Sequence, residues 1–123
     1  MNEEQLASIA NDMRIDIVRM IAEAGSGHPG GSLSCADILS VLYFDTMKHD
    51  PSNPKNEDRD RFILAKGHAA PALYAALAES GYFPKEELAT LRKLGTRLQG
   101  HPDMNLLPGI EVSTGSLGQG MSE

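Results

Sequence analysis

The stretch Gly25–Ser32 (GSGHPGGS) most constrains the fold, because it separates two strongly apolar segments of helical periodicity. It holds four of the twelve glycines, together with Pro29 and His28. Glycine opens backbone dihedral angles that are closed to other residues, whereas proline fixes one of them. A plain connection between two helices needs fewer glycines. The stretch is therefore either a flexible connector, the commoner case for such loops, or one wall of a binding site.

The segments on both sides of this stretch are predicted to be helices. Apolar residues at three- and four-residue steps predict a helix over residues 5–24 that ends at Gly25. Ser34 is predicted to cap a second helix over residues 36–47, which is apolar nearly all round and is expected to be buried. Cys35 is expected to be a buried, inert thiol in its first turn. In this chain alone, both helices are expected to leave apolar faces uncovered.

The rest of the chain combines loops, shorter helices and one predicted strand. Residues 49–56 contain two prolines and predict a surface loop in which His49 is exposed and idle. Phe62–Ala65 predicts a strand buried on both faces, as in a parallel sheet. Further helices are predicted to end at Gly81 and to cover roughly residues 84–95. The pattern indicates an α/β fold, a parallel sheet flanked by helices, mostly helical in this stretch and incomplete.

Composition excludes several classes of protein. A chain of 123 residues has room for one domain. The net charge of −6 argues against nucleic acid and against an anionic membrane surface, since both select clustered Lys and Arg. No apolar run approaches the ~20 residues that span a bilayer, and the N-terminus lacks the basic start of a signal peptide. Cys35 is the only cysteine, so we expect a reducing, cytoplasmic location.

Histidine recurs beside glycine in three predicted loops, at His28, His68 and His101. An imidazole titrates near neutral pH and can donate to a phosphate or a hydroxyl. Zinc binding is the rival interpretation, but no two histidines have ligand spacing on one helix, so we predict no metal site among them. Residues 25–30 match G-x-G-x-x-G, yet they follow a helix and not a strand, which excludes the dinucleotide fingerprint. Gly115–Gly120 is either a backbone cradle for a ligand or a plain helix-entry loop.

Five pieces of the chain resemble the N-terminal part of transketolases, and most closely the N-terminal subunit of split, two-gene transketolases. The pieces are Ser26–Ser34, Asp37–Phe44, Arg61–Ala69, Gly100–Pro102 and Gly115–Gly120. They occur in family order over nearly the whole chain, and the ordered set is far more specific than any one motif.

The resemblance implies the thiamine diphosphate-binding α/β fold, with residues 1–123 as the N-terminal part of a single diphosphate-side domain that is incomplete at its C-terminus. It implies transfer of a two-carbon ketol unit from a ketose phosphate to an aldose phosphate, as in the pentose phosphate pathway. His68 would lie near the cofactor diphosphate and the donor substrate. His28 and His101 would line the substrate channel as catalytic and substrate-binding residues. Backbone contacts with the cofactor are implied for Gly115, Ser116 and Leu117.

The family also has parts that this sequence does not contain. Its magnesium ligands belong to a Gly-Asp-Gly motif and a later Asn, expected downstream of this chain. Its activating glutamate lies in a separate domain, which split enzymes place on a C-terminal subunit. We therefore expect a homo- or hetero-oligomer and no activity for this chain alone. The alternatives are another enzyme of the superfamily, such as a deoxyxylulose-phosphate synthase or an unusual-sugar transketolase, and a non-catalytic remnant or assembly module.

Overall fold

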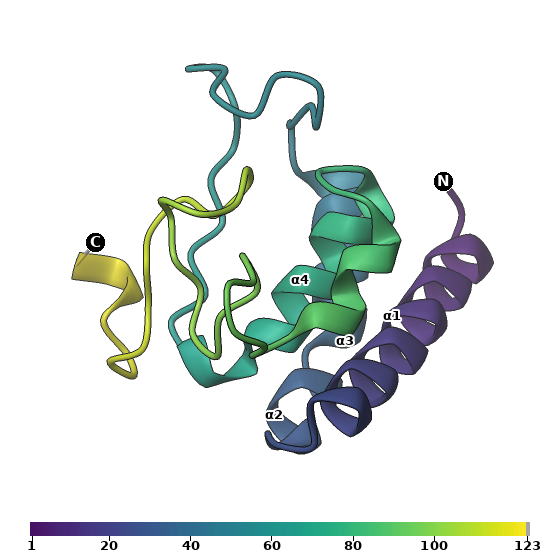
Figure 1. Cartoon of the computed structure of the whole chain (residues 1–123). Helices are drawn as coiled ribbons and strands as arrows, with labels where there is room; N and C mark the ends of the chain where they lie inside the picture. The colour runs from purple at the N-terminus through teal and green to yellow at the C-terminus, as the bar shows by residue number, and fades with distance from the viewer. Residues whose placement is uncertain (123) are drawn as a thin grey trace.

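The computed structural model describes residues 1–122, and three helices form its centre. The elements in chain order are α1 (Glu3–Ala24), α2 (Pro29–Leu33), α3 (Ala36–Val41), the π-helical turn η1 (Leu42–Thr46), and the 3₁₀ turn η2 (Gly67–Ala69), then α4 (Ala70–Ser80) and the 3₁₀ turns η3 (Lys85–Thr90) and η4 (Gly120–Ser122). Helices α1, α3 and α4 pack against one another. The loops that lead to the C-terminus lie on the opposite side of α4 from α1 (Figure 1).

The sequence accounts for both ends of α1. Asn2 caps the helix by accepting from the Gln5 N–H, and the Gln5 side chain accepts from the Asn2 N–H in return. Gly25 ends the helix in the left-handed conformation, with φ 70°. The predicted helix and its stop are confirmed.

Helix α4 is the most deeply buried element, because every residue from Ala70 to Ala78 is buried. Its many alanines allow neighbouring helices to approach closely. Tyr74 is the large side chain at its centre, and its hydroxyl donates to the Gln99 carbonyl at 2.6 Å. This bond joins the helical core to the loop that precedes His101.

The prediction of a buried strand at Phe62–Ala65 is wrong for the described residues, since residues 1–122 contain no strand. Leu64 is buried, whereas Phe62, Ile63 and Ala65 are only half-buried. A strand requires a neighbour for its hydrogen-bond ladder, and no second extended segment of residues 1–122 lies beside this one. The Ala65 carbonyl accepts instead from the N–H of Gly118, at 3.1 Å.

The α-helical part of the second predicted helix is shorter than expected. Its first residue is Ala36, and the prediction that Ser34 caps it is wrong, because the Ser34 hydroxyl donates to the Gly31 carbonyl at 3.0 Å. The helix changes to the π-turn after Val41. Cys35 is buried as predicted, and burial raises the pKa of its thiol, which keeps it protonated and unreactive.

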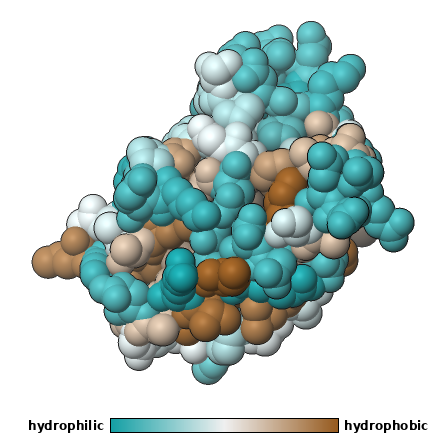
Figure 2. All heavy atoms as spheres, turned by 90° about the vertical axis from the view of Figure 1, so that its right-hand side faces the viewer, coloured by the Kyte–Doolittle hydropathy of each residue, from teal (hydrophilic) through white to brown (hydrophobic). Residues whose placement is uncertain are grey.

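Two helices expose apolar side chains. Ile38 and Val41 of α3 are 60% and 41% exposed, which corrects the expectation that this helix is buried all round. On α1, Ile15 and Val18 are 42% and 52% exposed. Figure 2 shows hydrophobic surface among hydrophilic side chains on the α1 side of the molecule. The prediction of uncovered apolar faces is confirmed for the described residues.

His49 is not idle, contrary to the sequence expectation. Its Nε2 lies 2.6 Å from the Tyr43 carbonyl oxygen and its Nδ1 lies 2.8 Å from the Tyr82 hydroxyl. Its ring also stacks on Tyr82, with centroids 5.7 Å apart. A carbonyl only accepts, so Nε2 carries the hydrogen, and in the neutral ring Nδ1 accepts from the Tyr82 hydroxyl. His49 thus fastens the start of the loop over residues 47–61 to the helical body.

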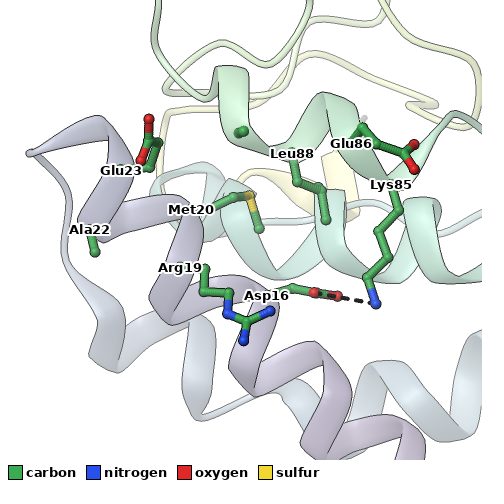
Figure 3. A pocket seen from close by; sticks show the side chains of 9 residues that line it. Asp16, Arg19, Met20, Ala22, Glu23, Lys85, Glu86 and Leu88 are labelled. Carbon is green, nitrogen blue, oxygen red and sulfur yellow. Dashed lines mark ion pairs between the residues drawn. The ribbon is translucent and has the colours of Figure 1, made fainter.

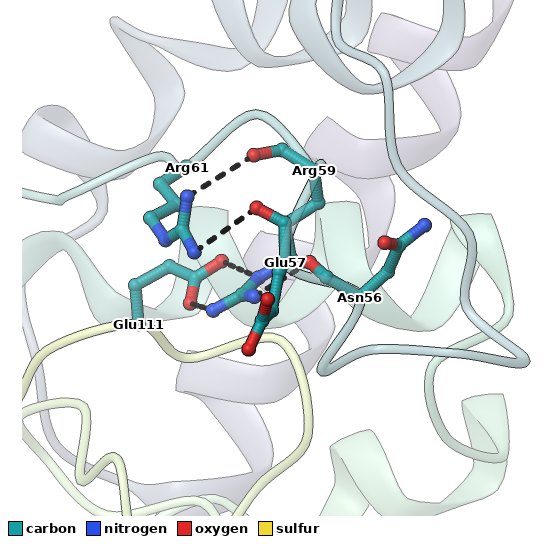
Figure 4. A network of polar contacts seen from close by, with 5 residues as sticks. All are labelled: Asn56, Glu57, Arg59, Arg61 and Glu111. Carbon is teal, nitrogen blue, oxygen red and sulfur yellow. Dashed lines mark hydrogen bonds and ion pairs between the residues drawn. The ribbon is translucent and has the colours of Figure 1, made fainter.

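The other end of that loop is held by an ion pair. Arg59 donates from Nε and Nη2 to the two carboxylate oxygens of Glu111, at 2.8 and 2.6 Å (Figure 4). Both side chains are mostly buried, at 13% and 14% exposed. Bidentate geometry makes this pair more specific than a surface salt bridge. The charged segment over residues 57–61 therefore contributes an ion pair that holds this loop to the rest of the fold.

The helix predicted over residues 84–95 is only the 3₁₀ turn η3, which ends at Thr90. Leu91 leaves helical geometry, and Arg92 adopts φ 62°. Among residues 1–122, no helix combines the length and apolar character that a membrane crossing requires.

Candidate functional site

The first contact between two of the glycine–histidine stretches joins Gly31 to His68. His68 is exposed in η2, and a Cβ atom added to Gly31 would lie 3.1 Å from its Nε2. A side chain at Gly31 would therefore displace the exposed His68 ring by a few tenths of an ångström. The structure therefore brings the His68 ring against the short helix α2, which begins directly after His28.

The second contact is between two backbones. A Cβ atom added to Gly67 would lie 2.7 Å from the nitrogen of Gly115 and 2.7 Å from the carbonyl carbon of Thr114. Backbone atoms cannot yield as a flexible side chain can, so a glycine is required at residue 67. Gly67 consequently packs directly against the backbone at the start of the second glycine-rich stretch.

The third contact joins His101 to the same glycine. A Cβ atom added to Gly115 would lie 3.6 Å from Cγ of the His101 ring. Thr114 donates its N–H to the Pro102 carbonyl at 3.3 Å, which fixes the two segments side by side. His101 is exposed and lines a groove of about 390 Å³ with Gln99, Gly100, Pro102, Asp103 and Ser113.

His28 has a different environment. It is exposed and occupies the N-cap position of α2 without a side-chain capping bond. The second half of the predicted Gly25–Ser32 loop is thus helical from Pro29. Within residues 1–122, the His28 side chain makes no hydrogen bond and no ring contact with His68 or His101. The structure brings together the segments that carry the three histidines, without direct contact between the rings.

The Gly115–Leu117 backbone offers hydrogen-bond donors. The N–H groups of Gly115, Ser116 and Leu117 donate to no acceptor within residues 1–122, whereas those of Thr114 and Gly118 on either side are bonded. All three residues are exposed. The segment is thus fixed at both ends and presents three consecutive donors between them, which suits an anionic or polar ligand.

Two buried hydroxyls adjoin the same contacts. Thr114 Oγ1 and Ser32 Oγ are buried and have no hydrogen-bond partner in the described part of the chain. Buried polar atoms are nearly always paired, so an unpaired one calls for an explanation. Thr114 directly precedes the free N–H groups. Ser32 directly follows Gly31, the residue that lies against the His68 ring.

Arg92 is a candidate site residue that the sequence did not predict. It is the only non-glycine residue of the described chain with positive φ. Its guanidinium lies 3.3 Å from a Cβ added to Gly100 and 3.8 Å from one added to Gly27. Arg92 therefore reaches the residues beside both His28 and His101. Strained backbone clusters at functional sites, but nothing in the local sequence predicts it.

Another groove of the described chain lies away from these residues. It has a volume of about 670 Å³, lies between α1 and η3, and contains none of the predicted site residues (Figure 3). Lys85 Nζ there lies 3.6 Å from Asp16 Oδ1 and 2.7 Å from Glu79 Oε1. Burial, assisted by Glu79, raises the pKa of Asp16 to about 7. Within residues 1–122, no three His, Cys, Asp or Glu side chains are grouped to hold a metal ion.

Comparisons with known proteins agree with the convergence of these motifs. Residues 5–123 match the family described as "Transketolase, thiamine diphosphate binding domain". The chain is 52% identical to the 6-deoxy-6-sulfo-D-fructose transketolase subunit SqwG of Clostridium sp. (strain MSTE9), covering 99% of this chain and 45% of that protein. It is 43% identical to one of the subunits of the apulose-4-phosphate transketolase of Phocaeicola vulgatus, covering 99% of this chain and 43% of that protein.

A solved structure shows the same fold. The transketolase of Campylobacter jejuni superposes with a TM-score of 0.91 at 44% identity, covering 99% of this chain and 19% of that one. The chain thus spans less than half the length of these relatives. This similarity confirms the predicted fold class, and residues 1–122 make up a helical part of it without strands. The chain belongs to the transketolase family, and residues 5–123 match its thiamine diphosphate-binding domain.

Proposed function

We propose that this chain is the N-terminal part of the diphosphate-side domain of a split transketolase. The reaction is thiamine diphosphate- and magnesium-dependent transfer of a two-carbon ketol unit from a ketose phosphate to an aldose phosphate. The observation that carries this proposal is the row of free N–H groups at Gly115, Ser116 and Leu117, packed against Gly67 and the His101 ring. Those donors suit a cofactor held through the backbone.

Each candidate residue has a chemical role in the proposal. Thiamine diphosphate, when bound, supplies the electron sink of the reaction. The backbone N–H groups of residues 115–117 hold and orient it, and His68 donates to its diphosphate or to the donor substrate. His28 and His101 donate to sugar hydroxyls and move protons at the reacting oxygens, for which imidazole is suited near neutral pH. Arg92 adds a cation at the rim between the segments of His28 and His101.

The proposal includes a partner. Two relatives are named as transketolase subunits, and this chain covers 45% and 43% of them. We infer that the magnesium ligands lie on sequence downstream of this stretch and that the activating glutamate comes from a C-terminal subunit in a homo- or hetero-oligomer. The 123-residue chain alone is then not a competent enzyme. A cytoplasmic location and a role in the pentose phosphate pathway belong to the same proposal.

A second candidate is an unusual-sugar transketolase. The two subunit relatives are named for 6-deoxy-6-sulfo-D-fructose and for apulose-4-phosphate, and the first is 52% identical to this chain. The chemistry at the cofactor is common to both candidates, so His28, His68 and the backbone of residues 115–117 serve either one. Assays of the complete enzyme with sulfonated and phosphorylated ketoses, compared by kcat/KM, separate the two.

The test of the catalytic assignment compares two histidines in the complete protein with its partner subunit. His68→Ala is expected to lower kcat/KM for ketol transfer by about 100-fold or more, as expected for loss of a positioned acid–base group. His49→Ala removes bonds to Tyr43 and Tyr82 and is expected to lower stability, with little change in kcat of the folded fraction. Equal losses of kcat in the two variants would overturn the assignment.

The claim that the chain is incomplete has its own test. Isothermal titration of the 123-residue chain with thiamine diphosphate and Mg²⁺ is expected to give no magnesium-dependent binding. The extended subunit, continued past residue 123, is the positive control. Micromolar, magnesium-dependent binding by the short chain would contradict the proposal. Ketol transfer absent from the complete, assembled protein would favour a non-catalytic assembly module.

A further inference from the structure

Lys66 makes a polar contact that the proposed function does not use. Its side chain is half-buried, and its Nζ donates to the Gly31 carbonyl at 2.7 Å and to Ser34 Oγ at 3.1 Å. Ser34 Oγ itself donates to the Gly31 carbonyl at 3.0 Å. The ammonium, the hydroxyl and the carbonyl therefore form a closed triangle between the residue before Gly67-His68 and the helix α2.

The triangle lies where the two segments need to be held together. Gly67 is fixed on one side by the backbone of Thr114 and Gly115, where an added Cβ would meet backbone atoms at 2.7 Å. On its other side, the His68 ring lies against Gly31, where an added Cβ would meet its Nε2 at 3.1 Å. A contact between a ring and a glycine has little directional preference, so it does not set the distance by itself. The Lys66 bond to the Gly31 carbonyl supplies that direction.

The chemistry of Lys66 suits this role. Within residues 1–122 it forms no ion pair with a carboxylate, so its donors go to neutral oxygen atoms. A charged donor makes a shorter and stronger hydrogen bond to a carbonyl than a neutral donor does. An ammonium also offers three donors, which allows separate bonds to Gly31 and Ser34.

We propose that Lys66 is a positioning residue, which fixes the α2 segment that follows His28 at a set distance from the His68 imidazole. It acts through the Gly31 carbonyl and makes no contact with substrate. Its catalytic consequence rests on the proposed function, whereas its structural consequence does not. The two are tested separately.

The structural test uses the 123-residue chain itself. In ¹H–¹³C and ¹H–¹⁵N NMR spectra, Lys66→Met is expected to shift the His68 ring resonances and the Gly31 and Ser34 amide resonances. The matched control Lys55→Met removes a lysine of the 47–61 loop, with the same change of charge, and is expected to leave these resonances in place. Identical His68 spectra in the parent and in Lys66→Met would overturn the proposal.

The catalytic test uses the complete enzyme with its partner subunit. Lys66→Met is expected to lower kcat by about 10- to 100-fold, since small misplacements of a reacting group cost this much, while KM changes by less than about threefold. Because Ser34 acts on the same carbonyl, Lys66→Met combined with Ser34→Ala is expected to lose less than the product of the single losses.

Chemical rescue separates the ammonium from the fold. Lys66→Cys treated with 2-bromoethylamine regains an ammonium at nearly the same reach and is expected to recover kcat to within about fivefold of the parent. The parent enzyme treated identically controls for the buried Cys35 thiol. Multiplicative losses without rescue would overturn the proposal. If the parent enzyme has no ketol-transfer activity, the proposed function fails, and the NMR comparison alone decides the role of Lys66.

Discussion

Replacing Asp16 with asparagine tests the electrostatics of the helical core. Asp16 on α1 is 6% exposed and forms an ion pair with Lys85 (Figure 3). Glu79 of α4 lies beside it and shares the Lys85 cation. Its Oδ2 has no hydrogen-bond partner among residues 1–122. Two carboxylates beside one ammonium are most stable when they share a proton. Burial and the neighbouring Glu79 raise the pKa of Asp16 from 3.8 to about 7. Burial also tends to raise the pKa of Glu79, but hydrogen bonding with Asp16 and the charge of Lys85 outweigh it, so the pKa of Glu79 is lowered.

The sign and size of the effect follow from linkage. Between about pH 4 and pH 7 the folded state keeps a proton on Asp16 that the unfolded chain has released, so the free energy of unfolding falls as pH rises. A shift of about 3 units corresponds to at most about 4 kcal/mol. The lowered pKa of Glu79 adds stability as pH rises and offsets part of this loss. We expect a net penalty of about 1–2 kcal/mol above pH 7.

Asparagine keeps the shape of the side chain, donates an N–H to Glu79 at every pH and carries no charge. Asp16→Asn is therefore expected to be about 1–2 kcal/mol more stable than the parent at pH 8, and equal to it within about 0.5 kcal/mol at pH 5. Urea unfolding followed by circular dichroism measures both values, with Asp45→Asn, an exposed acid on η1, as the control. A variant that is less stable than the parent at pH 8 would refute the shared proton.

Three further predictions concern packing. Gly67→Ala is expected to lower the free energy of unfolding by about 1–3 kcal/mol, because the added Cβ would meet backbone atoms at 2.7 Å. Gly30→Ala, where an added Cβ meets nothing within 4 Å, is the control and is expected to be neutral in the same urea titration. Equal costs in the two variants would contradict the contact. Tyr82→Phe removes the hydroxyl that donates to His49 and is expected to lower the free energy of unfolding by about 1 kcal/mol at pH 8. An unchanged free energy of unfolding would mean that the bond is absent in solution. The exposed apolar face that includes Ile38 is expected to make the isolated chain self-associate in sedimentation experiments, and a monodisperse monomer would count against this.

Local sequence signals predicted the elements whose determinants are local. The apolar periodicity and Gly25 predicted α1, because a helix is specified by contacts within four residues and by its caps. The same reasoning failed at Ser34, where the hydroxyl donates to the nearby Gly31 carbonyl and does not cap α3. A capping residue has several local partners, and tertiary packing at Lys66 favoured a different one here.

The candidate site was only partly predictable. The order of the motifs along the chain was sufficient to identify the family, since each glycine–histidine pair can be recognised in the sequence without knowledge of the fold. Arg92 was not predictable, because its position depends on a left-handed backbone conformation and on two glycines distant in sequence. The role of His49 was not predictable either, because tertiary packing brings its two partners, the Tyr43 carbonyl and the Tyr82 hydroxyl, next to its ring.

The sequence by itself determined helix α1 with its stop at Gly25, the fold class and the ordered motifs that identify the family, because these depend on residue type and short-range spacing. Only the tertiary structure decided that Gly31 faces His68, that Gly67 faces Gly115 and that His101 lies against the same glycine. The physical reason is that a glycine has no side chain whose size, charge or polarity would indicate which segment packs against it. What a glycine permits is a close approach, and which segment approaches it depends on how the helices α1, α3 and α4 pack.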